Sequence, residues 1–195
     1  MKEAFRKESD SVGTLEVSAD AYYGVQSLRG HNNFQITGQK MNPCFVKNIV
    51  RIKKAAALVN GRYKYIPQSH AEAIVTACDE ILNGKWADAF ITDAIQGGAG
   101  TTVNMNVNEV VANRATELLG GKLGEYICHP NDHVNYAQST NDVIPTAGKL
   151  TVLDLAKTLL SRLQKLIDAL EEKAKQFDSV VKMGRTQLQD AVPIR

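Results

Sequence analysis

A long pattern of apolar residues in the second half of the chain predicts one helix from Asp142 to about Phe177. The spacings between apolar residues alternate between three and four, which is typical of a helix that packs against other helices along one seam. Further leucines widen the stripe, so we expect more than one helical neighbour. The seam residues are Leu153, Ala156, Leu160, Leu163, Ile167, Leu170, Ala174 and Phe177.

A helix of this length implies a large helix bundle. At about 1.5 Å per residue it would be roughly 50 Å long, whereas the average helix has only about 11–12 residues. A chain of 195 residues supplies only part of such a bundle. The fold class predicted is therefore mainly α. Residues 1–140 are expected to form a mostly helical N-terminal domain, and residues 141–195 the incomplete beginning of a central helical-bundle domain.

Shorter apolar patterns predict further helices upstream of the long one. One begins at Pro43, with Asn42 as its cap, and runs to about Asn60. Glycines follow each of the other predicted helices and would end them. Those helices cover 69–83 and 101–119, with a short helical turn over 85–90.

The two ends of the chain give weaker patterns. Val12, Leu15 and Val17 alternate with polar residues and permit a short strand. A polar loop is expected at Arg29, His31, Asn32 and Asn33. After a turn at Gly184, a second helix antiparallel to the long one is expected, and the chain stops inside it at Arg195. We therefore expect a piece of a longer protein.

Composition narrows the functional classes. Hydrophobic content of 44%, charged content of 23% and a net charge of +2 describe a soluble globular chain with no nucleic-acid partner. Neither a signal peptide nor a membrane span is expected, because residues 1–10 lack an apolar core and no apolar run approaches the roughly 18 residues a span needs. Three cysteines without CxxC spacing indicate reduced thiols and a cytoplasmic protein.

Two polar segments carry the candidate chemistry. Three glycines in four residues precede Thr101, which permits either a plain connection or a close backbone approach to a ligand. Asn104, Asn106 and Asn108 follow, and form either an exposed polar face or hydrogen bonds across a subunit contact. The second segment, 129–142, ends in a run of four residues that favour helix N-termini. This run is either a simple cap or an anion site at the start of the long helix.

A metal site is not expected in the second segment. His129 and His133 are four residues apart, a spacing found in zinc proteins. Pro130 argues against a regular helix between them, and no cysteine or carboxylate completes a ligand set at fixed spacing. We expect no metal and no cofactor.

Four segments occur in register along the chain: Gly13–Gly24, Gly98–Glu109, His129–Asp132 with Gln138–Asp142, and Gly184–Asp190. Together they resemble the fumarase/aspartase superfamily over essentially the whole chain. Within it, the chain looks most like the aspartase branch, because fumarases usually carry a second serine at Thr140 and a histidine at Gln187. The resemblance implies elimination of ammonia from L-aspartate to give fumarate, through an aci-carboxylate intermediate. The alternatives are a class II fumarase and a non-catalytic helical scaffold.

The resemblance also implies which residues contact the substrate, and a homotetramer in which three subunits build each site. The family's second-site residues would match His129, Asn131 and Asp132, where we expect no catalysis. No catalytic residue is expected in these 195 residues, because the family's general-base serine lies on a Gly-Ser-Ser loop that they do not contain. The chain alone is therefore expected to be inactive. The predicted substrate-binding residues are Thr101, Ser139, Thr140, Asn141, Thr186 and Gln187.

Overall fold

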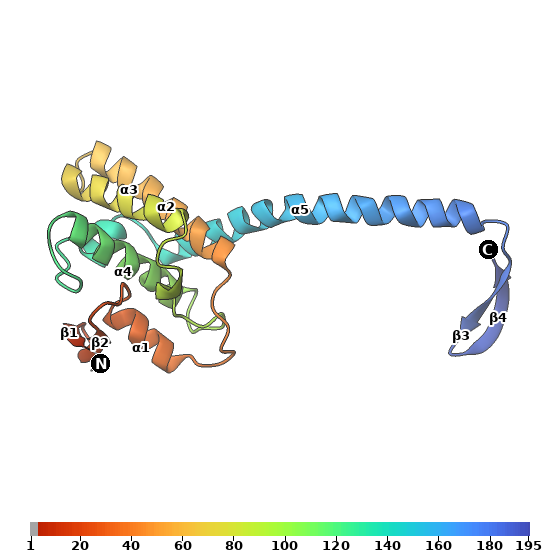
Figure 1. The fold of residues 1–195 in the computed structure, drawn as a ribbon, viewed down its shortest axis with the longest axis horizontal. Helices are drawn as coiled ribbons and strands as arrows, with labels where there is room; N and C mark the ends of the chain where they lie inside the picture. The colour runs from red at the N-terminus through yellow and green to blue at the C-terminus, as the bar shows by residue number, and fades with distance from the viewer. Residues whose placement is uncertain (1–3) are drawn as a thin grey trace. The chain divides into compact units, whose positions relative to one another are not determined.

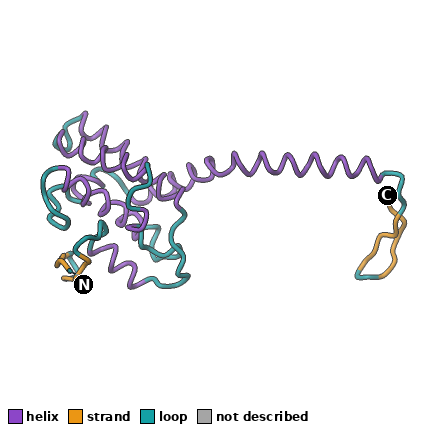
Figure 2. Tube along the Cα trace, in the orientation of Figure 1, coloured by secondary structure: helices purple, strands orange, loops and turns teal. Residues whose placement is uncertain are grey.

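The computed structural model describes residues 4–195, so the first three residues of the N-terminal segment considered for a signal peptide lie outside it. The predicted mainly α fold is confirmed, as helices make up most of the chain (Figures 1 and 2). The chain divides into two compact units, Met1–Thr151 and Val152–Arg195, which are described separately below. Within residues 4–195, no helix combines the length and apolar character that crossing a bilayer requires.

The first unit opens with an antiparallel hairpin of β1 (Phe5–Ser9) and β2 (Thr14–Ser18). The strand permitted by Leu15 and Val17 is therefore present, and Val17 is fully buried. Asp10 shapes the connection, because its carboxylate accepts the backbone N–H groups of Val12 and Gly13 at 2.9 and 3.0 Å.

The prediction of a polar loop at Arg29–Asn33 is wrong, because these residues belong to α1 (Val25–Asn33). The cause is a distant carboxylate. Glu109 accepts the backbone N–H groups of Gly24, Gln26 and Ser27, each at 2.9 Å, and so satisfies the free donors at the start of α1. Burial raises the pKa of Glu109. Nothing local in the sequence reveals this cap, because its acceptor lies more than 80 residues away.

Two antiparallel helices form the next layer, α2 (Pro43–Arg62) and α3 (Gln68–Leu82), and they lie side by side (Figure 1). Both were predicted to within about two residues. The Asn42 side chain accepts the N–H of Cys44 at 2.9 Å and caps α2 as expected. Ile49 is buried in this layer, whereas Val59 near the end of α2 is 52% exposed. A short 3₁₀ turn, η1 (Ala87–Ala89), follows α3.

Helix α4 (Thr101–Leu118) lies at the centre of the first unit, in contact with α1 and α3. Its asparagines contradict both predictions made for them, because they are buried and hydrogen-bonded within the chain. Asn106 Nδ2 donates to Ala89 O at 3.0 Å, and its Oδ1 accepts the N–H of Ile91 at 3.0 Å. A central helix surrounded by neighbours has no free face on which asparagines could be exposed.

The long helix is present as α5 (Thr140–Phe177), 38 residues in one element. Its first part packs in the first unit, where Val143, Ala147 and Thr151 are buried. From Val152 onward the seam has no partner among the described residues: Leu153 is 63% and Leu160 62% exposed. Burial of this seam needs other chains or residues beyond these.

The prediction of a helix after Gly184 is wrong. The second unit instead ends in an antiparallel hairpin of β3 (Lys182–Thr186) and β4 (Gln189–Ile194). Gln187 and Leu188 connect the strands with φ angles of 48° and 70°, the left-handed values of a tight hairpin turn. Pro193 explains the outcome, because proline interrupts a helix interior but is tolerated in an edge strand.

Candidate functional site

The N-termini of α4 and α5 meet in the first unit, and this junction contains four of the predicted substrate-binding residues. Gly100, the cap of α4, packs against Ile144 in the first turn of α5. One turn into α4, Asn104 Nδ2 lies 3.4 Å from Oγ1 of Thr140, the first residue of α5. Two segments nearly 40 residues apart in sequence are thereby brought together.

The start of α4 leaves backbone donors available. Its cap, Gly100, has a φ of 84° and provides no side-chain oxygen to the first turn. The N–H of Val103 is satisfied by Gln96 Oε1 at 2.7 Å. Thr101 is exposed, so its hydroxyl and the free N–H groups of the first turn are accessible to a ligand.

The start of α5 is capped by Ser139. Its Oγ accepts the N–H of Asn141 at 3.2 Å and its carbonyl accepts the N–H of Val143 at 3.0 Å. The simple-cap interpretation is thus confirmed for Ser139. Ser139 and Asn141 are exposed and Thr140 is half-buried, so side-chain donors and acceptors gather at this helix start as well.

A buried polar cluster, not foreseen from the sequence, lies behind the junction. Asn135 Oδ1 accepts three bonds: from Lys53 Nζ at 2.7 Å, and from the side-chain amides of Asn104 and Asn108 at 3.2 Å each. Asn135 Nδ2 in turn donates to the carbonyl of Gln138 at 3.0 Å. We name these four residues, Lys53, Asn104, Asn108 and Asn135, the Lys53 cluster.

Lys53 is fully buried, and it has no ion pair within residues 4–195. Burial lowers its pKa to about 7, because the surroundings solvate the charged amine poorly. No sequence signal identifies it. Lys53 and Lys54 are adjacent in one amphipathic helix, yet Lys54 reaches the surface and pairs with Asp79 at 2.6 Å.

The histidine pair considered for metal binding organises its own loop. His129 caps η2 (Pro130–Val134), a short π-helical segment, by accepting the N–H groups of Asn131 and Asp132 at 3.3 and 3.2 Å. The N–H of His129 donates to His133 Nδ1 at 2.8 Å. Burial lowers the pKa of His133.

Thr186 and Gln187 belong to the second unit, where they lie at the turn of the β3–β4 hairpin and are exposed. The structure therefore brings together Thr101, Ser139, Thr140 and Asn141, all in the first unit, and holds Thr186 and Gln187 on a separate one.

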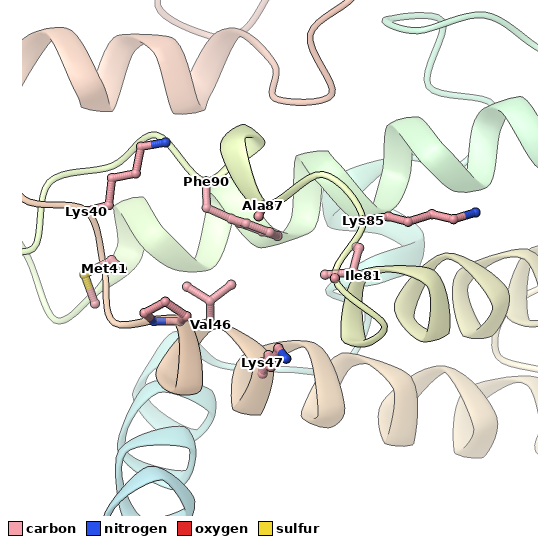
Figure 3. A pocket seen from close by; sticks show the side chains of 10 residues that line it. Lys40, Met41, Val46, Lys47, Ile81, Lys85, Ala87 and Phe90 are labelled. Atoms are coloured by element: carbon pink, nitrogen blue, oxygen red, sulfur yellow. The ribbon is translucent and has the colours of Figure 1, made fainter. Parts of the chain in front are cut away.

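A small cavity lies elsewhere in the first unit and contains none of the predicted site residues (Figure 3). Its volume is about 130 Å³, and its walls are largely apolar, with three lysines among the lining side chains. The labelled residues in Figure 3 are Lys40, Met41, Val46, Lys47, Ile81, Lys85, Ala87 and Phe90.

The junction is suited to binding an anion. Two helix N-termini each contribute a partial positive charge of about half an elementary charge, and the first turn of α4 adds free N–H groups. Hydroxyl groups from Thr101, Ser139 and Thr140 add donors that need no reorganisation as negative charge develops. None of these hydroxyls is a general base at neutral pH without an activating partner.

Comparisons with known proteins identify the family to which the chain belongs. A family described as "Lyase" matches residues 13–195. The aspartate ammonia-lyase of Bacillus subtilis (strain 168) is 52% identical over 192 residues, which cover 98% of this chain and 40% of that protein. The chain thus spans about two-fifths of the length of the curated relatives it matches.

Solved structures show the same fold. The crystal structure of fumarate lyase:delta crystallin from Brucella melitensis in native form superposes with a TM-score of 0.87 at 47% identity, covering 98% of this chain and 45% of that one. A recombinant class II fumarase from Schistosoma mansoni gives a TM-score of 0.85 at 39% identity, covering 98% and 41% respectively.

Proposed function

Because the chain belongs to the fumarase/aspartase lyase family, we propose that it is part of an aspartate ammonia-lyase and supplies the substrate-binding segments of that enzyme's site. The observation that carries this proposal is the junction of α4 and α5, where Thr101 and Ser139–Asn141 meet at two helix N-termini. The reaction is the reversible elimination of ammonia from L-aspartate to give fumarate.

The chemistry accounts for the residue types at the junction. Removing a proton beside a carboxylate places a second negative charge on that group, as an aci-carboxylate dianion. The helix N-termini and the hydroxyls of Thr101 and Thr140 stabilise this charge as it forms, which lowers the barrier. Residues Thr186 and Gln187 of the β3–β4 hairpin complete the substrate contacts in the assembled enzyme.

The proton acceptor comes from outside these residues. Neither a Gly-Ser-Ser sequence nor a Lys-Val-Asn sequence occurs among the 195 residues, and in the family the former carries the base. We expect the 195-residue chain alone to form no fumarate from L-aspartate. Turnover by this chain alone would contradict that expectation.

The assembled enzyme is proposed to be a homo-oligomer. The exposed seam of α5, which includes Leu163 and Leu170, supports this because an apolar stripe of this length is stable in water only when covered. Symmetric packing of copies of the chain would cover it with an equivalent seam.

A class II fumarase is the second candidate, favoured by the similarity to the Schistosoma mansoni enzyme. Thr140 and Gln187 argue for the ammonia-lyase. Absorbance of fumarate formed from L-aspartate and from L-malate, by the product of the complete reading frame, separates the two. Turnover of L-aspartate supports the proposal, and turnover of L-malate alone supports the fumarase. Turnover of neither, with intact succinate binding at the junction, supports a binding scaffold.

A further inference from the structure

We propose that Lys53 is a positioning residue of the substrate site: through Asn135 it holds the segment that carries Ser139–Asn141 in place, and its buried ammonium supplies positive charge behind that segment. The proposal deepens the proposed function and rests on it. It concerns a residue on α2, which contributes none of the predicted substrate contacts.

The connection runs through four hydrogen bonds that lead from Lys53 to the segment: two lie within the Lys53 cluster and two join the cluster to Gln138 and Thr140. Lys53 Nζ donates to Asn135 Oδ1 at 2.7 Å, and Asn135 Nδ2 donates to Gln138 O at 3.0 Å, directly before Ser139. A second branch leads from Asn135 Oδ1 through Asn104 Nδ2 to Thr140 Oγ1, at 3.2 and 3.4 Å. The side-chain amide of Asn135 thus accepts the hydrogen bond from Lys53. It also orients the backbone of the segment at Gln138 and, through Asn104, the side chain of Thr140.

The burial of this lysine is costly, which argues for a role. A fully buried ammonium without a carboxylate partner destabilises the fold, and apolar residues at such positions usually cost less. The groups that interact with Lys53 are the thiol of Cys78 from α3 and the amide of Asn135. The Oδ1 atom of Asn135 also accepts the side-chain amides of Asn104 and Asn108 from α4. Burial raises the pKa of Cys78, so that thiol stays neutral and does not balance the charge.

The charge has an evident use at the junction. The segments 97–104 and 135–144 contain no lysine or arginine. Under the proposed function, however, these segments bind a dicarboxylate. An unpaired cation in a poorly solvated interior acts over longer distances than one in water. Below its pKa of about 7 Lys53 is mostly protonated, and it then adds an attraction for dianions that the uncharged hydroxyl and amide donors cannot provide.

The test substitutes Lys53→Met, which has a similar length and removes the charge. Asn135 Oδ1 keeps the amides of Asn104 and Asn108 as donors, so the substitution does not leave this acceptor unpaired. Lys54→Met is the matched control, because it removes the same charge from the adjacent residue at the surface. Both variants are made in the product of the complete reading frame, and circular dichroism checks that they fold.

Two readouts are expected to move in Lys53→Met and not in Lys54→Met. The KM for L-aspartate should rise about tenfold with kcat changed less than about threefold, because binding of the dianion is weakened before chemistry. Amide hydrogen exchange at Asp142 and Val143, which donate to Ser139 O, should accelerate about tenfold, while exchange in α3 stays unchanged. A merely structural role would accelerate exchange in α3 as well.

The outcomes separate the two proposals. Unchanged exchange at Asp142 and Val143 overturns the positioning role, as does an unchanged KM in an enzyme that turns over L-aspartate. If the wild type forms no fumarate and Lys53→Met still shows the accelerated exchange, the proposed function is overturned and the positioning role is supported.

If the Lys53→Met variant does not fold, the same test is made with the Asn135→Asp variant. Aspartate keeps the acceptor for Lys53 and pairs its charge, but loses the donor to Gln138 O. The same rise in KM and the same faster exchange are expected, and their absence overturns the proposal.

Discussion

Gly100 and Ile144 are in direct contact where α4 and α5 begin: a Cβ atom at Gly100 would lie 2.9 Å from both Cγ1 and Cγ2 of Ile144. Contacts this short are not seen for real side chains, so only glycine allows the two helix starts to approach so closely. The φ of 84° at Gly100 also favours glycine. The geometry of the junction therefore depends on one missing methyl group.

Gly100→Ala is predicted to lower the free energy of unfolding by about 2–3 kcal/mol, of which roughly 1–2 kcal/mol is backbone strain and the rest the clash with Ile144. Urea denaturation measures the change. The matched control is Gly120→Ala, which has a φ of 88° and no atom within 4 Å of the added Cβ. Equal losses in the two variants would show that the contact with Ile144 is unimportant.

Thr101→Val is predicted to lower kcat/KM for L-aspartate about 100- to 1,000-fold in the product of the complete reading frame, the usual cost of removing one preorganised donor. Valine keeps the shape of threonine, so the folded structure should be unchanged. Thr76→Val is the control, because that hydroxyl bonds only to Glu72 O on the surface of α3. Full activity in Thr101→Val would remove this residue from the site.

The buried Lys53 predicts a pH dependence of stability. Its pKa is about 7 in the folded protein and 10.5 when solvated, so between these values the unfolded chain binds more protons than the folded one. The stability of the wild type relative to Lys53→Met should therefore rise with pH from about 7 to 10, by at most about 1.4 kcal/mol per pH unit. Denaturant titrations at several pH values measure this difference. Parallel curves would show that Lys53 has an ordinary pKa in the folded state.

The exposed seam of α5 predicts self-association. Leu160→Asp should weaken it, because a carboxylate buried between packed helices costs several kcal/mol. Sedimentation velocity on the product of the complete reading frame measures the oligomeric state. Thr158→Asp adds the same charge beside the seam and should leave the assembly intact. An assembly that is unaffected by Leu160→Asp would place the interface elsewhere.

The sequence predicted what depends on local pattern. The periodicity of Leu153 to Phe177 identified α5, and Asn42 with Pro43 identified the start of α2. It failed where distant residues decide. Arg29 was assigned to a loop, although Glu109 caps the helix that contains it. A helix was expected after the turn at Gly184, although the chain forms the β3–β4 hairpin there.

The candidate site divides in the same way. Thr101 and Thr140 were predicted from recognisable segments, and the structure places them at one junction. Lys53 could not be predicted, because whether a lysine in an amphipathic helix is buried or exposed depends on which neighbours pack over it. Lys54, with the same local surroundings in sequence, is at the surface.

The cap that Glu109 provides to α1 also orders events during synthesis. A helix of nine residues has little stability by itself. Until α4 has formed and presents the carboxylate, only water can accept the N–H groups that Glu109 binds in the folded chain. Residues 25–33 therefore leave the ribosome long before they become helical. At about 5–20 residues per second they wait several seconds for residue 109 to emerge, and for that time the N-terminal segment is a substrate for chaperones and proteases.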